Sequence, residues 1–187
     1  MATLDPKVML TTSGEVEQRE QKLFGLLERL GIETVTHRHP PLHTVEESRR
    51  LRGDIEGGHC KSLFLKDKKG QLLLVVLMED RRLDMKKLTA YGLLPTGRLS
   101  FAPPELMEEI LGVTPGSVTP FSLINVPSEI LQQGRLTVVL DQAMMAHEKL
   151  NYHPLHNQAT TTIRTADLDK FIRHFGLSPV IIDFDNL

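Results

Sequence analysis

Apolar residues in the first thirty positions recur at the spacing of an amphipathic helix. Five of them share one helical face before Gly31: Val16, Leu23, Leu26, Leu27 and Leu30. The preceding Thr12-Ser-Gly-Glu15 has the form of a capping box, whose side chains satisfy the free backbone amides at a helix start. The pattern therefore predicts an N-terminal helix over about residues 13–31. A second capping box, Thr44-Val-Glu-Glu47, predicts a short polar helix that ends near Gly53.

Strand-like segments follow each of these two helices. Residues 33–39 contain the β-branched Val35 and Thr36, which predicts a short strand that Pro40-Pro41 stops. Residues 61–66 and 71–78 are apolar, and Asp67-Lys-Lys-Gly70 between them places a glycine where a hairpin needs a left-handed residue. Further strands are predicted at 99–102, 136–140, 159–163 and 180–184.

Three more helices are predicted after residue 83. Asp84 caps one that runs through Tyr91, Pro103-Pro104 begins another that ends near Gly112, and Thr165 caps the last. Helices and strands are intermixed without a regular βαβ order, so we expect a mixed sheet and not a doubly wound parallel one. The length of 187 residues, with no repeat or long linker, predicts one domain over residues 1–187.

Composition narrows the class of protein. With 40% hydrophobic and 25% charged residues, the chain has the make-up of a soluble globular protein. Its longest apolar run, residues 72–78, is far shorter than the roughly 20 residues of a membrane helix, and no signal peptide is apparent, so we expect a cytoplasmic protein without a membrane partner. A net charge of −2 provides no overall cationic field for DNA. Contacts with RNA must then be local, where lysines and arginines gather within 61–69 and 81–87.

The common catalytic motifs are missing from the chain. It has no G-x-S-x-G elbow, phosphate-binding loop, H-E-x-x-H pair or dinucleotide fingerprint, which points to a site that positions substrate and water. The single cysteine, Cys60, is interpreted as a small buried hydrophobe and not as a nucleophile. Two histidine clusters offer partial metal-ligand sets, which are His37, His39 and His43, and His147, His153 and His156. No Cys or carboxylate completes either set at a recognisable spacing, so we predict neither a metal nor a cofactor.

Three segments carry a family resemblance. They are H-C-K-S-L-F-L-K-D-K-K-G at 59–70, G-V-T-P-G-S-V-T-P-F at 112–121 and Y-H-P-L-H-N-Q-A-T-T-T-I at 152–163. In this order they resemble the YbaK and prolyl-tRNA synthetase insertion-domain family, most closely its free-standing Ala-tRNA(Pro) deacylases. The resemblance extends from about residue 33 to the end of the chain. It implies an α/β (α+β) fold with a mixed, largely antiparallel curved sheet flanked by helices, and hydrolysis of Ala-tRNA(Pro).

The resemblance also implies roles for particular residues. Lys61 matches the functionally required lysine of the family, Gly116 opens its Gly-x-x-x-Pro loop, and His153 matches its His-Pro-Leu histidine. The expected substrate-binding positions are Ser62, Ser117, Thr119 and Pro120, together with Lys66 and Arg98, which resemble basic positions that guide the tRNA acceptor end. Ser62 departs from the family, since many relatives have Asn there, and a substrate contact of that amide is lost or passes through water here. A histidine before proline is equally compatible with a structural role, bonded to a backbone carbonyl.

The chemistry of these positions fits ester hydrolysis. An aminoacyl ester is already activated, so its hydrolysis needs a positioned water and donors for the developing oxyanion more than a protein nucleophile. Backbone amides of the loop at Gly116 can supply such donors, and Leu63 and Leu65 are candidates for the walls of a small side-chain pocket.

Several functions remain open at this point. The substrate can be another misacylated tRNA, such as Cys-tRNA(Pro) or a Ser- or Thr-charged tRNA. Alternatively, the chain is a non-catalytic regulator that binds aminoacyl ends or a synthetase. Prolyl-tRNA synthetase and elongation factor are the possible protein partners, and the mischarged tRNA itself is the expected one.

Overall fold

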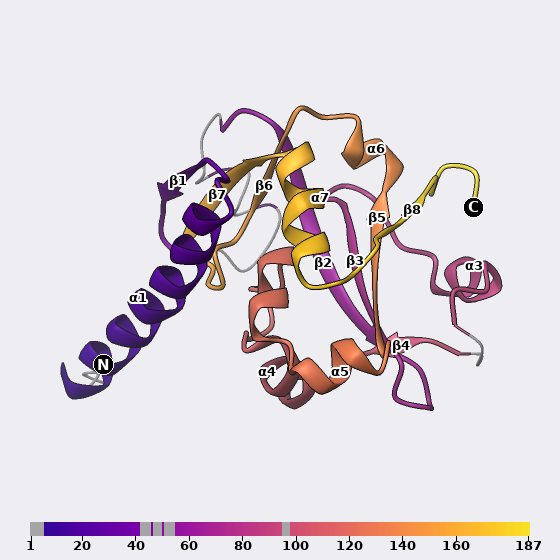
Figure 1. Cartoon of the computed structure of the whole chain (residues 1–187), viewed down its shortest axis with the longest axis horizontal. Helices are drawn as coiled ribbons and strands as arrows, with labels where there is room; N and C mark the ends of the chain where they lie inside the picture. Colours follow the sequence, from indigo (N-terminus) through magenta and orange to yellow (C-terminus); the bar gives the residue numbers. More distant parts are fainter. Residues whose placement is uncertain (1–5, 42–45, 47–49, 51–54, 95–97) are drawn as a thin grey trace.

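The computed structural model describes residues 6–41, 46, 50, 55–94 and 98–187, and its secondary structure is shown in Figure 1. The strands are β1 (Thr34–Arg38), β2 (Gly58–Lys66), β3 (Leu72–Met78), β4 (Ser100–Phe101), β5 (Leu136–Asp141), β6 (Lys149–Tyr152), β7 (Ala159–Arg164) and β8 (Val180–Ile182). The helices are α1 (Pro6–Arg29), α3 (Met85–Ala90), α4 (Pro104–Leu111), the 3-10 helix η1 (Pro120–Asn125), α5 (Ser128–Gln132), α6 (Gln142–Met145) and α7 (Thr165–His174). The polar helix expected from Thr44 to Gly53 lies outside the described residues, except for Glu46 and Arg50.

The described strands form one mixed sheet in the order β1-β7-β6-β2-β3-β5-β8, with β4 paired to β2. The pairs β1–β7, β6–β7, β2–β3 and β2–β4 are antiparallel, whereas β2–β6, β3–β5 and β5–β8 are parallel. Helix α1 lies beside β1 and β7 at one end of the sheet, and α3 lies at the opposite end (Figure 1). The prediction of an α/β fold with a mixed, mostly antiparallel sheet is confirmed.

Both faces of the central hairpin are covered, which explains why β3 is apolar at every position and β2 is apolar at Leu63, Phe64 and Leu65. Side chains alternate between faces along a strand. Phe64, Leu74 and Val76 pack in one core with residues of α1, α4 and α7. On the other face, Leu65 and Leu73 pack in a second core with Leu88 of α3 and Ile182 of β8. The predicted hairpin is present, and Gly70 in its turn has a φ of +81°.

Two predicted helix starts are wrong. Helix α1 begins at Pro6, so Thr12-Ser-Gly-Glu15 lies within it and is not its cap. Proline is favoured in the first turn because the amide hydrogen it lacks has no helical partner there. Helix α7 is capped by Arg164 without a side-chain bond, and Thr165 is its first residue. The Thr165 hydroxyl donates to the carbonyl of His147, which a local pattern does not reveal.

The elements that the pattern missed are all short. Strand β6 and the helices η1, α5 and α6 each span six residues or fewer, too few for a hydrophobic period to repeat. Among the described helices, none has the length and apolar character needed to cross a membrane.

Candidate functional site

A row of polar side chains crosses one face of the sheet from β2 to β7. We call it the polar face and define it as Lys61, Asn151, His153, Thr160 and Thr162. These residues share a face because His59 pairs with Asn151, and Asn151 in turn pairs with Thr162. Thr162 donates to the Asn151 side chain at 2.6 Å, and that side chain donates to the Glu56 carbonyl at 3.0 Å. Buried polar groups persist only when such bonds satisfy them.

Lys61 and His153 are brought to the same part of the polar face. The parallel pairing of β2 with β6 is formed at Gly58↔Leu150 and His59↔Asn151. Continuing this register by two residues places Lys61 level with His153. The intervening residues, Cys60 and Tyr152, support this placement, because both pack in the core on the opposite face.

The Lys61 ammonium is half-buried among charged neighbours. Burial lowers its pKa below the ordinary value, Glu79 opposes this shift, and Arg82 adds to it. No hydrogen bond or ion pair joins the ammonium to a residue within the described ranges. The charge is therefore available to a substrate group.

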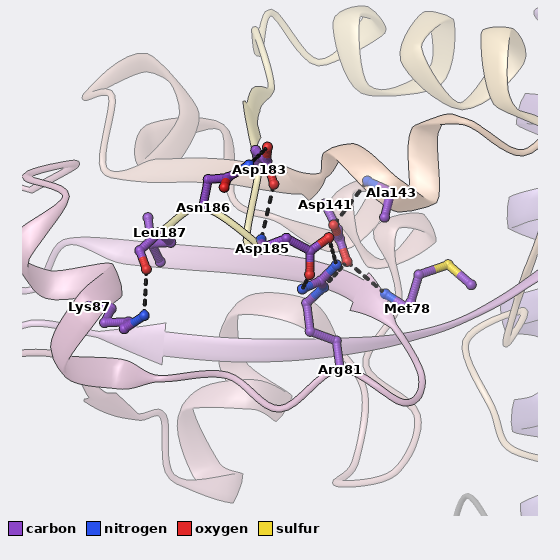
Figure 2. Close-up of polar contacts among 9 residues, drawn as sticks. All are labelled: Met78, Arg81, Lys87, Asp141, Ala143, Asp183, Asp185, Asn186 and Leu187. Carbon is purple, nitrogen blue, oxygen red and sulfur yellow. Dashed lines mark hydrogen bonds and ion pairs between the residues drawn. The ribbon is translucent and has the colours of Figure 1, made fainter.

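The segment that carries Glu79 and Arg82 is held by a buried ion pair (Figure 2). Arg81 Nε donates to Asp141 at 2.6 Å, and its two terminal nitrogens donate to the Asp185 carboxylate at 2.8 and 3.1 Å. Asp141 is fully buried and also accepts from the backbone N–H groups of Met78 and Ala143. Figure 2 shows Arg81 reaching from the loop after β3 to both carboxylates, so the charged neighbours of Lys61 sit on a fixed segment.

His153 is held as a neutral ring with one nitrogen engaged. Its Nδ1 lies 3.0 Å from the Ala159 carbonyl, and a carbonyl only accepts, so Nδ1 carries the hydrogen. Burial lowers the pKa of His153 below 6.5, the bond to Ala159 opposes this shift, and His39 and His156 reinforce it. Nε2 is then an acceptor, and it has no hydrogen-bond partner among the residues that the structure describes. His153 thus has the carbonyl bond of a structural histidine and a lone pair that can serve a water molecule.

The Gly-x-x-x-Pro loop approaches from the apolar face. Gly116 is exposed with a φ of +87°, a conformation that favours glycine, and a side chain there would meet no neighbouring atom. Ser117, Thr119 and Pro120 are buried, and the Thr119 hydroxyl accepts from Phe121 N at 3.3 Å as the cap of η1. The Phe121 ring lies 5.9 Å from that of Tyr152, the residue before His153. Phe121, which follows the loop, therefore packs beside the third family segment on the apolar face, opposite to Lys61.

The remaining predicted contacts lie elsewhere. Ser62 is on the apolar face, next to Cys60 and Phe64, and opposite to Lys61. Lys66 is five residues along β2 from Lys61, or roughly 16 Å at strand spacing, and pairs with Ser100 of β4. Arg98 is exposed just before that strand. Leu65 is fully buried in the second core, so it cannot line an open pocket, whereas Leu63 is only partly buried.

The other reactive side chains are occupied or inert. His39 Nδ1 donates to the Pro40 carbonyl at 2.9 Å, and its Nε2 accepts from Thr160 at 2.8 Å. His43 lies outside the described residues, and within them no three His, Cys, Asp or Glu side chains group as metal ligands. Burial raises the pKa of Cys60 to about 12, so its thiol is not a nucleophile at neutral pH.

Sequence reasoning missed Asn151, Thr160 and Thr162 as members of the site. The signal available for them was the polar run A-T-T-T-I at 159–163 within a predicted strand, which puts polar side chains on both faces. A groove of about 280 Å³ continues the polar face toward β1, and its lining includes Val35, His37, Glu56, Lys149 and Thr162.

Comparison with known proteins gives concordant results. The family described as the aminoacyl-tRNA editing domain matches residues 39–171. The prolyl-tRNA synthetase associated domain-containing protein 1 of Mus musculus is 35% identical over 174 residues, which cover 91% of this chain and 95% of the mouse protein. The prolyl-tRNA editing protein ProX of Acetoanaerobium sticklandii is 31% identical over 160 residues, covering 84% of this chain and 92% of ProX. A crystal structure described as a candidate trans-editing enzyme for prolyl tRNA synthetase has the same fold, with a TM-score of 0.65, 22% identity, and coverage of 97% of this chain and 98% of that one.

Proposed function

Because this chain belongs to the aminoacyl-tRNA editing domain family and is therefore a deacylase, a hydrolase of aminoacyl-tRNA, we propose that its substrate is Ala-tRNA(Pro). The observation that carries the choice of tRNA is the similarity to ProX, which is named a prolyl-tRNA editing protein and is matched over 92% of its length. We also propose that residues 1–187 act as one editing domain, in the cytoplasm, on mischarged tRNA produced by prolyl-tRNA synthetase. Elongation factor is the second protein with which it would share this substrate.

The proposed reaction is attack of water on the ester carbonyl. His153 Nε2 accepts a hydrogen bond from the water and orients its lone pair toward the carbonyl carbon, because Nδ1 is already committed to Ala159. The Lys61 ammonium, on the same face, binds the carbonyl oxygen or a neighbouring phosphate. Water supplies the hydroxyl of the released alanine, and the ribose oxygen of the tRNA leaves with a proton.

The Gly-x-x-x-Pro loop is proposed to contact the substrate through its backbone, apart from Lys61 and His153, since Phe121 at its end packs on the opposite face of the sheet. Gly116 is exposed, so amides next to it can donate to a substrate group. Thr119 and Pro120 hold the loop in shape, since the first caps η1 and the second is buried at its start. Ser62 and Ser117 are proposed to contact substrate through water or after local movement, and Lys66 and Arg98 to contact acceptor phosphates at the far end of β2.

Selection of alanine over proline must come from a side-chain pocket. The tRNA is the same in both esters, so contacts with phosphates contribute equally and cannot discriminate. A synthetase pocket sized for proline cannot exclude alanine, because each missing methylene changes binding by only ~1–3 kcal/mol. A second site too small for proline solves this problem.

The test is a single-turnover assay with tRNA(Pro) carrying alanine, proline, cysteine or serine. We expect rapid release of alanine and little release of proline, with a ratio that does not improve at higher salt. Equal rates for the alanyl and prolyl esters would refute the small-pocket proposal. A cysteinyl or seryl preference would reassign the substrate, and no turnover of any ester would favour a binding regulator.

A further inference from the structure

We propose that Glu20, on the N-terminal helix α1, is a positioning residue for His153 and acts through His156 and Arg38. The inference rests on the proposed function in one respect, namely that His153 serves the ester or the water. Helix α1 precedes residues 39–171, so the family match gives it no part in the site.

Glu20 is a buried carboxylate with two partners. It is 5% exposed and lies on the side of α1 that packs against the sheet. Its Oε1 accepts from His156 Nε2 at 2.7 Å and from one terminal nitrogen of Arg38 at 3.1 Å, while Oε2 accepts from the other at 2.7 Å. Burial raises the pKa of Glu20, but the bonds from Arg38 and His156 outweigh it and leave the pKa below its usual value. The carboxylate is therefore ionised at neutral pH and can hold both partners at once.

His156 transmits this contact to the turn between β6 and β7. Its Nδ1 accepts from the backbone N–H of Gln158 at 3.1 Å, so Nε2 carries the hydrogen and donates to Glu20. Both ring nitrogens are thus engaged, one with the turn and one with α1. Within the same turn Leu155 has a φ of +69°, which is unfavourable for leucine, and its side chain is buried in the core. The turn keeps this conformation because its surroundings hold it.

Arg38 reaches the same turn from β1. It pairs with Ala159, and the next residue, His39, donates its backbone N–H to the Gln158 carbonyl at 3.1 Å. Successive carbonyls along a strand point in opposite directions, so the Ala159 carbonyl points away from β1. It is this carbonyl that accepts from His153 Nδ1. Both partners of Glu20 therefore flank the group that orients the His153 ring.

The consequence is that α1 sets the tautomer and direction of His153. With glutamine at position 20, one neutral amide oxygen must serve both His156 and Arg38, so Arg38 loses its paired contact with the carboxylate and the turn is free to relax around Leu155. The Ala159 carbonyl then shifts relative to His153, and the His153 Nε2 atom is no longer held in a single direction. Misplacement of a reacting group by ~1 Å can cost about a hundredfold in rate.

The experiment compares Glu20→Gln with Glu28→Gln, the same change at an exposed position of α1. For Glu20→Gln we expect kcat for Ala-tRNA(Pro) to fall by about tenfold to a hundredfold, with KM within about threefold of wild type. Nitrogen NMR of histidine-labelled full-length protein should show His153 with its hydrogen on Nδ1 in the wild type and a mixture of tautomers in Glu20→Gln. Glu28→Gln should match the wild type in both measurements.

A second variant protects the test against loss of folding. Arg38→Met changes a side chain that is 66% exposed, and it should give the same tautomer mixture with a smaller loss of kcat. Wild-type kcat and an unchanged His153 tautomer in a folded Glu20 or Arg38 variant would overturn the inference. If His153→Gln itself retains wild-type kcat, the assignment of His153 to the reaction fails, while the NMR comparison still decides whether Glu20 positions the ring.

Discussion

Replacing Arg81 with alanine is expected to destabilise the protein by about 3 kcal/mol, because it leaves a buried carboxylate without its cation. The Asp141 side chain is fully buried and bonds Arg81 Nε at 2.6 Å. The opposite arm of Arg81 bonds Asp185, whose side chain is 71% exposed. Arg81→Ala therefore removes two contacts that contribute very differently to stability.

The magnitude follows from burial. Removing one partner of a buried ion pair costs ~3–5 kcal/mol, and the lower end applies because Asp141 keeps the backbone donors of Met78 and Ala143. Exposed pairs contribute ~0.2–1 kcal/mol, so Asp185→Asn should cost no more than about 1 kcal/mol. For a chain of this length, a loss of ~3 kcal/mol corresponds to a fall in Tm of roughly 6–12 °C. Adding Asp141→Asn to Arg81→Ala should recover part of the loss, since no charge then remains buried.

Urea unfolding of the wild type, the two single variants and the double variant measures these differences, provided that the m-values agree. Two results would refute the reasoning. One is a cost below 1 kcal/mol for Arg81→Ala, and the other is an equal cost for Asp185→Asn. A double variant less stable than Arg81→Ala would show that the Asp141 charge is not what makes the loss large.

Three further predictions concern the site. Lys61→Ala should lower the rate of deacylation by at least about tenfold with unchanged unfolding in urea, because its ammonium bonds no described residue; a folded variant with wild-type turnover would remove Lys61 from the mechanism. Cys60→Ser should leave turnover intact, since the pKa of the thiol is about 12. Exhaustive chelation should also leave turnover intact, because no described side chains group as metal ligands; activity lost on chelation and restored by one metal would contradict this. Burial lowers the pKa of His153 below 6.5, so the unfolded chain binds this proton first as the pH falls, and the residue makes stability decrease below pH 6.5. For the same reason, kcat/KM should keep its neutral-pH value to a lower pH than an unperturbed histidine allows. A pH profile of kcat/KM whose acid limb has its midpoint at or above pH 6.5, in a protein that keeps His39, His156 and Glu20, would contradict this prediction.

The elements that the sequence predicted correctly are those whose signal is local and repeated. The hairpin of β2 and β3, the cap of α3 by Asp84 and the end of α4 at Gly112 each depend on residues within a few positions of one another. The two wrong helix starts were also predicted from local signals. Thr12 and Thr165 have the right side chains for caps, but one lies inside a longer helix and the other bonds a carbonyl 18 residues away.

What the sequence determined by itself was the class of fold, the strand that carries Lys61, the glycine loop at Gly116 and, through the resemblance, the family. What only the tertiary structure decided was which side chains share a face. The polar face combines residues of β2, β6 and β7, and one more or one fewer residue in any pairing would turn its side chains to the opposite side of the sheet. The bond between Glu20 and His156 joins positions 136 residues apart. No local pattern encodes such a contact, because it exists only when α1 has packed against the sheet and the turn before β7 has closed beneath it.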